Sequence, residues 1–109
     1  MLEPRVINLE PDEDVDHLVV LSGPPETGSM RSGVVTLRAG TSVGLHSTKN
    51  YEELIIILQG QATVQVKDRT TVTIEAGQAF YCPPETEHDV FNSGDEPLQY
   101  IYIVAEVRK

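Results

Sequence analysis

Short β-branched segments separated by turn residues run through this chain, and their rhythm is what most constrains its fold. Residues 61–66 (QATVQV) alternate polar and apolar side chains, residues 67–69 form a charged turn, and residues 70–74 alternate again. A period of two is typical of a half-buried β-strand. No window of helical length carries a convincing apolar stripe at helical spacing. The sequence therefore predicts an all-β fold of the sandwich or barrel type.

Other β-branched and apolar runs complete the pattern. Residues 51–58 are apolar on both faces, as expected for a strand buried between two sheets. A short VINL segment, residues 6–9, could form an edge strand. Together the runs predict about eight to ten strands, the remaining ones at residues 17–21, 30–38, 41–46, 79–82, 88–91 and 98–107.

The length and composition of the chain limit the number of domains and the kinds of partner. A chain of 109 residues with 39% hydrophobic side chains fits a single domain over residues 1–109, with residues 1–16 as an N-terminal arm or edge strand. Acidic residues outnumber basic ones by 17 to 8, and neither sign forms a long block. Binding to a phosphate backbone requires clustered basic residues, so we expect no nucleic-acid partner.

The single cysteine and the apolar runs bear on the location of the protein. Cys82 has no second cysteine with which to form an intrachain disulfide. The first 17 residues lack the basic start and apolar core of a signal peptide, and no apolar run approaches the length of a membrane span. The expected location is the cytoplasm, with no membrane partner.

Residues 40–60 place ionisable groups directly before the most apolar run of the chain, residues 54–58. These groups are His46 and the adjacent carboxylates Glu52 and Glu53. Ionisable side chains pressed against a core require a partner there, and a metal ion is the partner we expect. A second stretch, residues 77–92 (GQAFYCPPETEHDVFN), supplies a further imidazole, His88.

The first stretch resembles the first motif of the cupin superfamily. That motif runs glycine, five residues, His-x-His, three or four residues, glutamate, six residues, glycine. In this chain it maps onto Gly40, His46, Thr48 where the second histidine is expected, Glu53 and Gly60.

The second stretch is similar to the second cupin motif. That motif runs glycine, five residues, Pro-x-Gly, two residues, histidine, three residues, asparagine. It maps onto Gly77, Pro83, Glu85 where glycine is expected, His88 and Asn92. The resemblance implies a small single-domain cupin, with the double-stranded β-helix or jelly-roll barrel of that family.

The resemblance implies that His46, Glu53 and His88 are metal ligands, and the strand parity agrees. Residues two apart in a strand face the same side, so Glu53 shares a face with Ile55, which we assign to the interior. Two imidazoles and one carboxylate leave coordination positions open for water, substrate or dioxygen. These ligands suit divalent iron, manganese, nickel, zinc or copper, and ligand type alone does not choose among them.

Thr48 departs from the ligand pattern, and two readings of the cluster stay open. The site either binds a metal with three protein ligands, with Thr48 bonding a bound water from the second shell, or it has lost its metal. In the second case His46, Glu53 and His88 form only a buried hydrogen-bonded group inherited from a metal-binding ancestor.

Other side chains are weaker candidates for the pocket. Cys82 is expected to pack as a small hydrophobe, although the pocket rim is an alternative place for it. Tyr100 or Tyr102 could present a phenol to a substrate, or could pack in the core or a dimer interface. The parity of Glu52 places it outside the pocket, and His17 is expected at a surface or edge.

Two classes of function follow from these observations. The first is a metal-dependent oxygenase, isomerase or lyase that acts on a small polar organic molecule. The second is a non-catalytic module that binds or senses a small molecule and has lost its metal. Fold alone does not decide between them. Because unpaired strand edges must be covered, and small cupins are often homodimers, we also expect a homodimer in which residues 6–9 or 17–21 pair with a second copy.

Overall fold

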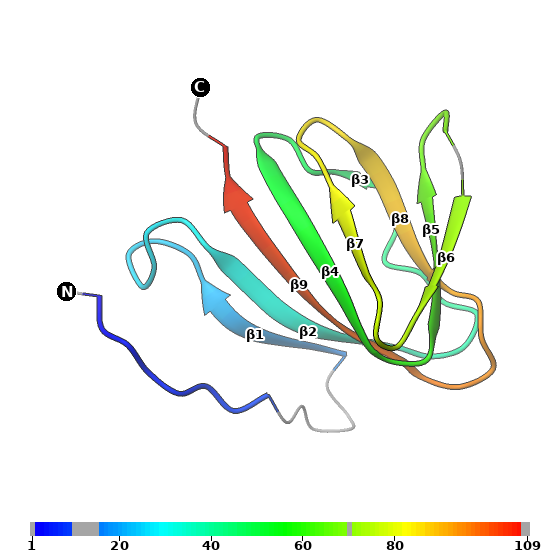
Figure 1. Ribbon diagram of the computed structural model, residues 1–109, viewed down its shortest axis with the longest axis horizontal. Helices are drawn as coiled ribbons and strands as arrows, with labels where there is room; N and C mark the ends of the chain where they lie inside the picture. Colours follow the sequence, from blue (N-terminus) through cyan, green and yellow to red (C-terminus); the bar gives the residue numbers. More distant parts are fainter. Residues whose placement is uncertain (1, 10–15, 70, 108–109) are drawn as a thin grey trace.

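Two antiparallel sheets make up the fold in the computed structural model, which describes residues 2–9, 16–69 and 71–107 (Figure 1). A five-stranded sheet has the order β1-β2-β9-β4-β7, and a four-stranded sheet has the order β3-β8-β5-β6. The all-β prediction is confirmed. The strands found in the described residues are β1 (His17–Ser22), β2 (Arg31–Leu37), β3 (His46–Ser47), β4 (Tyr51–Gln59), β5 (Gln61–Val66), β6 (Thr71–Glu75), β7 (Ala79–Cys82), β8 (Glu87–Asn92) and β9 (Leu98–Glu106).

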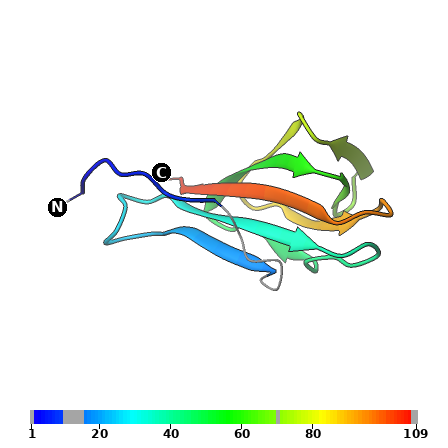
Figure 2. The same cartoon turned by 90° about the horizontal axis from the view of Figure 1, so that it is seen from below.

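The core lies between the two sheets, whose layered arrangement is visible from below (Figure 2). Alternate residues of each strand point inward, as the pleat of a strand requires. On β4 these inward residues are Ile55 and Ile57, and both are almost fully buried. Burying such side chains is the main favourable term in folding. The buried cluster consists of Val35, Ile55, Ile57, Ala62, Val64, Ile74, Val90, Leu98 and Tyr100.

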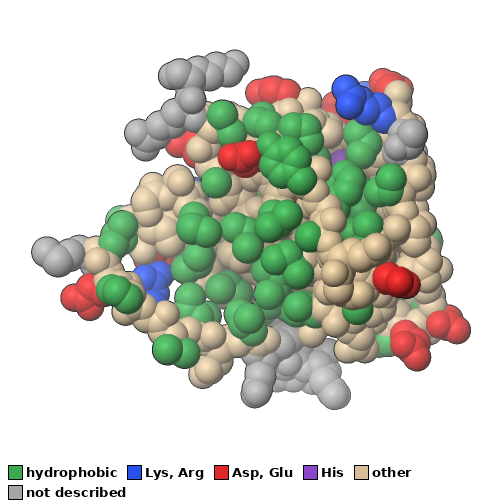
Figure 3. Space-filling view, viewed as in Figure 1, with side chains coloured by type: hydrophobic (Ala, Val, Ile, Leu, Met, Phe, Trp, Pro, Cys, Tyr) green, Lys and Arg blue, Asp and Glu red, His purple; other side chains and the backbone are tan. Residues whose placement is uncertain are grey.

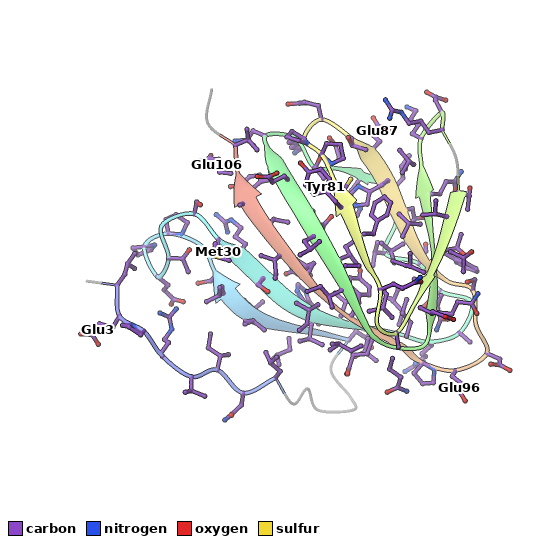
Figure 4. The ribbon with its side chains drawn as sticks, in the orientation of Figure 1. Glu3, Met30, Tyr81, Glu87, Glu96 and Glu106 are labelled. Carbon is purple, nitrogen blue, oxygen red and sulfur yellow. The ribbon has the colours of Figure 1, made fainter. Side chains whose placement is uncertain are left out.

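The prediction that residues 51–58 are buried on both faces is wrong. Leu54 and Leu58, which alternate with the core residues, are 37% and 42% exposed. The reason is that a two-layer fold covers only one face of each sheet. Hydrophobic side chains gather on the uncovered face of the five-stranded sheet (Figure 3), and Tyr81 of β7 projects there (Figure 4).

Residues 6–9, predicted as a candidate edge strand, form no strand. Their side chains are exposed, and the segment pairs with neither sheet. Residues 1 and 10–15 of the predicted arm lie outside the described residues, as does residue 70, the first residue of the strand predicted over residues 70–74. Between residues 41 and 46 the strand is reduced to an isolated bridge from Ser42 to Phe91 before β3. No helix of the described chain is long and apolar enough to cross a bilayer.

Two turn positions have the left-handed backbone that favours glycine, but only one of them is a glycine. Gly60, between β4 and β5, has a φ of 86°, and a Cβ there would lie 2.8 Å from the carbonyl oxygen of Pro97. Glu85 stands where the cupin pattern has glycine, and its φ is 54°. Left-handed backbone is unfavourable for residues with a Cβ. The loop therefore keeps a glycine-like conformation although the residue is glutamate.

Candidate metal centre

Three strands from both sheets bring His46, Glu53 and His88 together. His46 of β3 is the cross-strand partner of His88 on β8, and their ring centroids lie 4.4 Å apart. Glu53 comes from β4 of the opposite sheet and has the inward parity of Ile55 and Ile57. One ligand atom from each of the three side chains lies within 4.8 Å of the others. The predicted cluster therefore exists as a compact group of donors.

Glu53 and His88 are in direct contact inside the barrel. The Nε2 atom of His88 lies 2.9 Å from Oε1 of Glu53, and the side chains are 0% and 11% exposed. His46 is exposed at the mouth of the site. The centre is thus buried on one side and open to solvent on the other, as a site that admits a small molecule must be.

Backbone carbonyls orient both imidazoles. The Nδ1 atom of His46 is 2.8 Å from the carbonyl oxygen of Gly44, and Nδ1 of His88 is 3.3 Å from that of Thr86. When Nδ1 carries the proton and donates it to a carbonyl, Nε2 keeps a lone pair for a metal. This second shell of carbonyls is the arrangement usual for metal-ligating histidines, so the residues present fit a divalent metal ion.

The surroundings of His88 act on its pKa in opposite directions. Burial alone lowers the pKa of His88, since it disfavours the charged ring. The hydrogen bond and negative charge of Glu53, helped by the Thr86 carbonyl and by Asp89, outweigh burial and raise the pKa above its ordinary value. Glu53 therefore makes His88 easier to protonate than an ordinary histidine.

Cys82 lies directly behind His88. Its side chain is fully buried, and Sγ is 3.5 Å from Nδ1 of His88. Burial, together with the charge of Glu53, raises the pKa of the Cys82 thiol to about 11. The thiol is therefore protonated at neutral pH, and it packs against the imidazole as a small neutral group.

The hydroxyl of Thr48 is engaged by the loop before β8. It donates to the carbonyl oxygen of Pro83 at 2.8 Å and accepts a hydrogen bond from the backbone N–H of Thr86 at 3.0 Å. Thr48 is buried and lines the pocket beside His46. Its hydroxyl proton is committed to Pro83, so the side chain ties together the loop that carries His88.

The remaining candidates make their side-chain hydrogen bonds to residues other than the three donors. The hydroxyl of Tyr102 is 2.7 Å from Nε2 of His17, on the edge strand β1. Gly33 lies beneath this contact, since a Cβ there would come within 2.7 Å of both groups. Glu52 accepts a hydrogen bond from the hydroxyl of Tyr81 at 2.8 Å, on the face opposite to that of Glu53. Sequence parity had placed Glu52 outside the pocket in the same way.

A pocket of about 220 Å³ opens beside the donors. Sequence reasoning did not single out Arg31, Tyr51 and Val104 as members of it. One signal was available for Arg31, which lies an even number of positions before the core residue Val35 on the same strand. A larger hollow of about 440 Å³ lies between the N-terminal arm and residues 25–26, away from the donors. The pocket beside the donors is lined by Arg31, His46, Ser47, Thr48, Tyr51, Glu53 and Val104.

Comparison with known families agrees with this architecture. Residues 33–104, which contain both motifs, match the family described as Cupin domain. The chain belongs to the cupin family, and its two facing sheets are the double-stranded β-helix of that family.

Individual relatives define the fold but not the activity. The Cnp3 cupin domain of Schizosaccharomyces pombe superposes with a TM-score of 0.75 at 26% identity, over 83% of this chain and 63% of that one. A Cupin 2 conserved barrel domain protein of Salinispora arenicola has a TM-score of 0.73 at 24% identity, over 95% and 88% of the two chains. An uncharacterized protein of Methanocaldococcus jannaschii is 31% identical over 62 residues, which are 57% of this chain. The matched segment spans about half, 49%, of that curated relative.

Proposed function

We propose that this protein is a metal-binding cupin in which His46, Glu53 and His88 hold one divalent transition metal. The observation that carries the proposal is the orientation of the imidazoles. Both Nδ1 atoms face backbone carbonyls, which leaves Nε2 of each ring as the nitrogen that can ligate a metal, and Nε2 of His88 already lies beside the Glu53 carboxylate. The donor set suits iron, manganese, nickel, zinc or copper.

The reaction that best fits such a centre is that of an oxygenase, isomerase or lyase on a small polar organic molecule. A bound metal would supply Lewis acidity or the activation of dioxygen. The chain itself contributes the pocket, in which Val104 offers an apolar wall while Tyr51 and Ser47 offer hydroxyl groups. The Gly44 and Thr86 carbonyls hold the ligand rings in place, and the loop tied by Thr48 positions His88.

Elemental analysis of protein purified without chelator or affinity metal tests the proposal. The wild type is expected to carry nearly one equivalent of metal, and the His46→Ala, His88→Ala double variant none. His17→Ala is the matched control, because His17 is the third histidine and contacts Tyr102 instead of the donors. A wild type that binds none of the five metals on addition would contradict the proposal.

A non-catalytic cupin that has lost its metal is the alternative, and one observation favours it. The His88 and Glu53 side chains satisfy each other at 2.9 Å, and neither is among buried side-chain polar atoms without a partner, of which the described residues contain none. The same elemental analysis separates the two functions, because a cupin that has lost its metal would contain none as purified and would bind none on addition.

A second copy of the chain is the partner that we propose for the exposed surfaces of the five-stranded sheet. β1 is an edge strand of that sheet, and the sheet's outer face exposes Leu54, Leu58 and Tyr81. Unpaired edges and apolar patches of this kind are usually covered.

The cytoplasmic location stays a prediction.

A further inference from the structure

Arg31 lies in one cross-strand row with the candidate metal ligand Glu53. On the five-stranded sheet Arg31 pairs with Val104, and Val104 pairs with Glu53 on its other side. Neighbouring strands are about 4.8 Å apart, so the backbone positions of Arg31 and Glu53 are separated by about two strand spacings. The end of the sheet that holds this row is marked by Met30 and Glu106 (Figure 4).

The guanidinium of Arg31 is held in place by the hairpin between β1 and β2. Nη1 donates to the carbonyl oxygen of Ser22 at 2.9 Å. The group lies directly against Gly23, where a Cβ would be only 2.7 Å from Cζ of Arg31. One anchored N–H leaves the rest of the planar fork available, and a preorganised fork loses less freedom when it binds a carboxylate.

Arg31 has no carboxylate partner among the residues that the structure describes. The ion pairs found there are Lys67 with Glu87 and His88 with Glu53. The nearby carboxylate of Glu26 instead accepts a hydrogen bond from Ser22 at 2.7 Å. In a chain with a formal net charge of −9, a guanidinium without a carboxylate at the rim of a pocket is available for an anion from solution.

We propose that the pocket takes a small carboxylic acid anion, with Arg31 as the residue that binds its carboxylate while the far end of the molecule faces His46 and Glu53. The inference rests on the proposed metal centre for the second contact. A divalent ion, the Glu53 carboxylate and the Arg31 guanidinium together carry a net charge of plus two, which a dicarboxylate neutralises and a monocarboxylate reduces to plus one. The apolar side chain of Val104 lies between the two contacts and fits a short carbon chain.

Titration with malonate, and with the neutral analogue malonamide, tests the assignment. Calorimetry measures binding to the metal-free and the cobalt(II)-loaded protein, and the visible spectrum of cobalt reports whether the ligand reaches the metal. We expect wild type to bind malonate and not malonamide. Arg31→Gln should weaken the affinity for malonate about 10- to 100-fold, the usual value of a charge-assisted hydrogen-bonded contact. Arg31→Lys keeps the charge and loses the fork, so its affinity for malonate should lie between those of wild type and Arg31→Gln.

Arg69→Gln is the matched control, because it changes the net charge equally on the turn between β5 and β6. It should bind malonate as wild type does. Unchanged malonate affinity in Arg31→Gln, or equal affinity of wild type for malonate and malonamide, would overturn the inference. If Arg31→Gln does not fold, Arg31→Lys serves as the test variant. An affinity of Arg31→Lys for malonate equal to that of wild type would then overturn the inference.

The outcome for the metal is read separately, from the cobalt stoichiometry. Binding of one equivalent of cobalt without binding of malonate would rule out the carboxylate site and support the metal centre. A protein that does not bind cobalt would rule out the metal centre. In that case Arg31-dependent binding of malonate to the metal-free protein supports the carboxylate site, and its absence overturns it.

Discussion

Nε2 of His88, on an imidazole that is completely buried, lies 2.9 Å from Oε1 of Glu53. Glu53 and the Thr86 carbonyl raise the pKa of His88 against the opposing effect of burial. A histidine whose pKa is higher in the folded than in the unfolded protein stabilises the fold when protonated. This stabilisation is complete below the unfolded pKa of about 6.5 and is lost as the pH rises through the folded pKa.

The metal-free protein should therefore lose the benefit of this pair at alkaline pH. In EDTA, Glu53→Gln should lower the free energy of unfolding by about 2 kcal/mol near pH 5.5, the usual value for a hydrogen bond to a charged group. The difference between wild type and variant should shrink toward pH 9. Urea denaturation across this range measures it, with Glu52→Gln as the control outside the pocket. A difference that does not change with pH would show that His88 does not titrate in this way.

Metal binding should show the opposite dependence on pH. A metal and a proton compete for Nε2 of His88, and the raised pKa of His88 keeps the proton in place to a higher pH. Below that pKa, displacement of one proton makes zinc affinity rise by about tenfold per pH unit. Calorimetry in two buffers with different protonation enthalpies counts the released protons. Zinc binding without proton release near pH 6 would contradict the assignment of His88 as a ligand.

Thr48 should contribute to stability more than to metal binding. Thr48→Val removes the partner of the Pro83 carbonyl and of the Thr86 N–H, and loss of these two partly buried hydrogen bonds should cost about 1 to 3 kcal/mol. Thr48→Ser retains the hydroxyl and should remain near wild type. Chemical denaturation measures the stability, and elemental analysis should find the same metal content in both variants. Loss of metal in a folded Thr48→Val protein would assign Thr48 to the metal site instead.

Local sequence patterns were sufficient to predict most of the strands. Period-two alternation placed residues 61–66, and turn chemistry placed the hairpin that follows, because both depend on neighbours along the chain. The outer face of β4 was predicted wrongly, since the apolar character of Leu54 and Leu58 does not reveal how many layers cover a sheet. The same limit applies to residues 6–9, because their apolar character does not reveal whether a sheet edge will pair with them.

The candidate site was likewise predictable only in part. Motif spacing predicted that His46, Glu53 and His88 come together, and the structure places their donor atoms within 4.8 Å. The hydrogen bonds of Thr48 link residues 35 and 38 positions apart, and no local pattern could identify these partners. The row that connects Arg31 to Glu53 depends on the register of three strands, which the sequence alone does not specify.

Glu85→Gly should stabilise the protein. Glu85 has a φ of 54° at the position where the cupin pattern has glycine, and glycine relieves the strain of a left-handed backbone. The gain should be about 1 kcal/mol, or about 4 °C in the melting temperature of a domain of this size. Glu85→Ala, which removes the side chain and keeps the Cβ, should show no such gain. If both variants melted at the same temperature, the strain at residue 85 would be negligible.

A homodimer should be found in solution, with the five-stranded sheet at its interface. Size-exclusion chromatography with light scattering at micromolar concentration should give twice the 12.0 kDa mass of the chain. Leu54→Lys and Leu58→Lys place charges on the apolar outer face, where burial in an interface would be costly, so the double variant should shift toward monomer. Lys in place of Thr63 is the matched control, because Thr63 belongs to β5 of the other sheet. A 12.0 kDa wild-type monomer at this concentration would contradict the prediction and leave the exposed leucines without a partner.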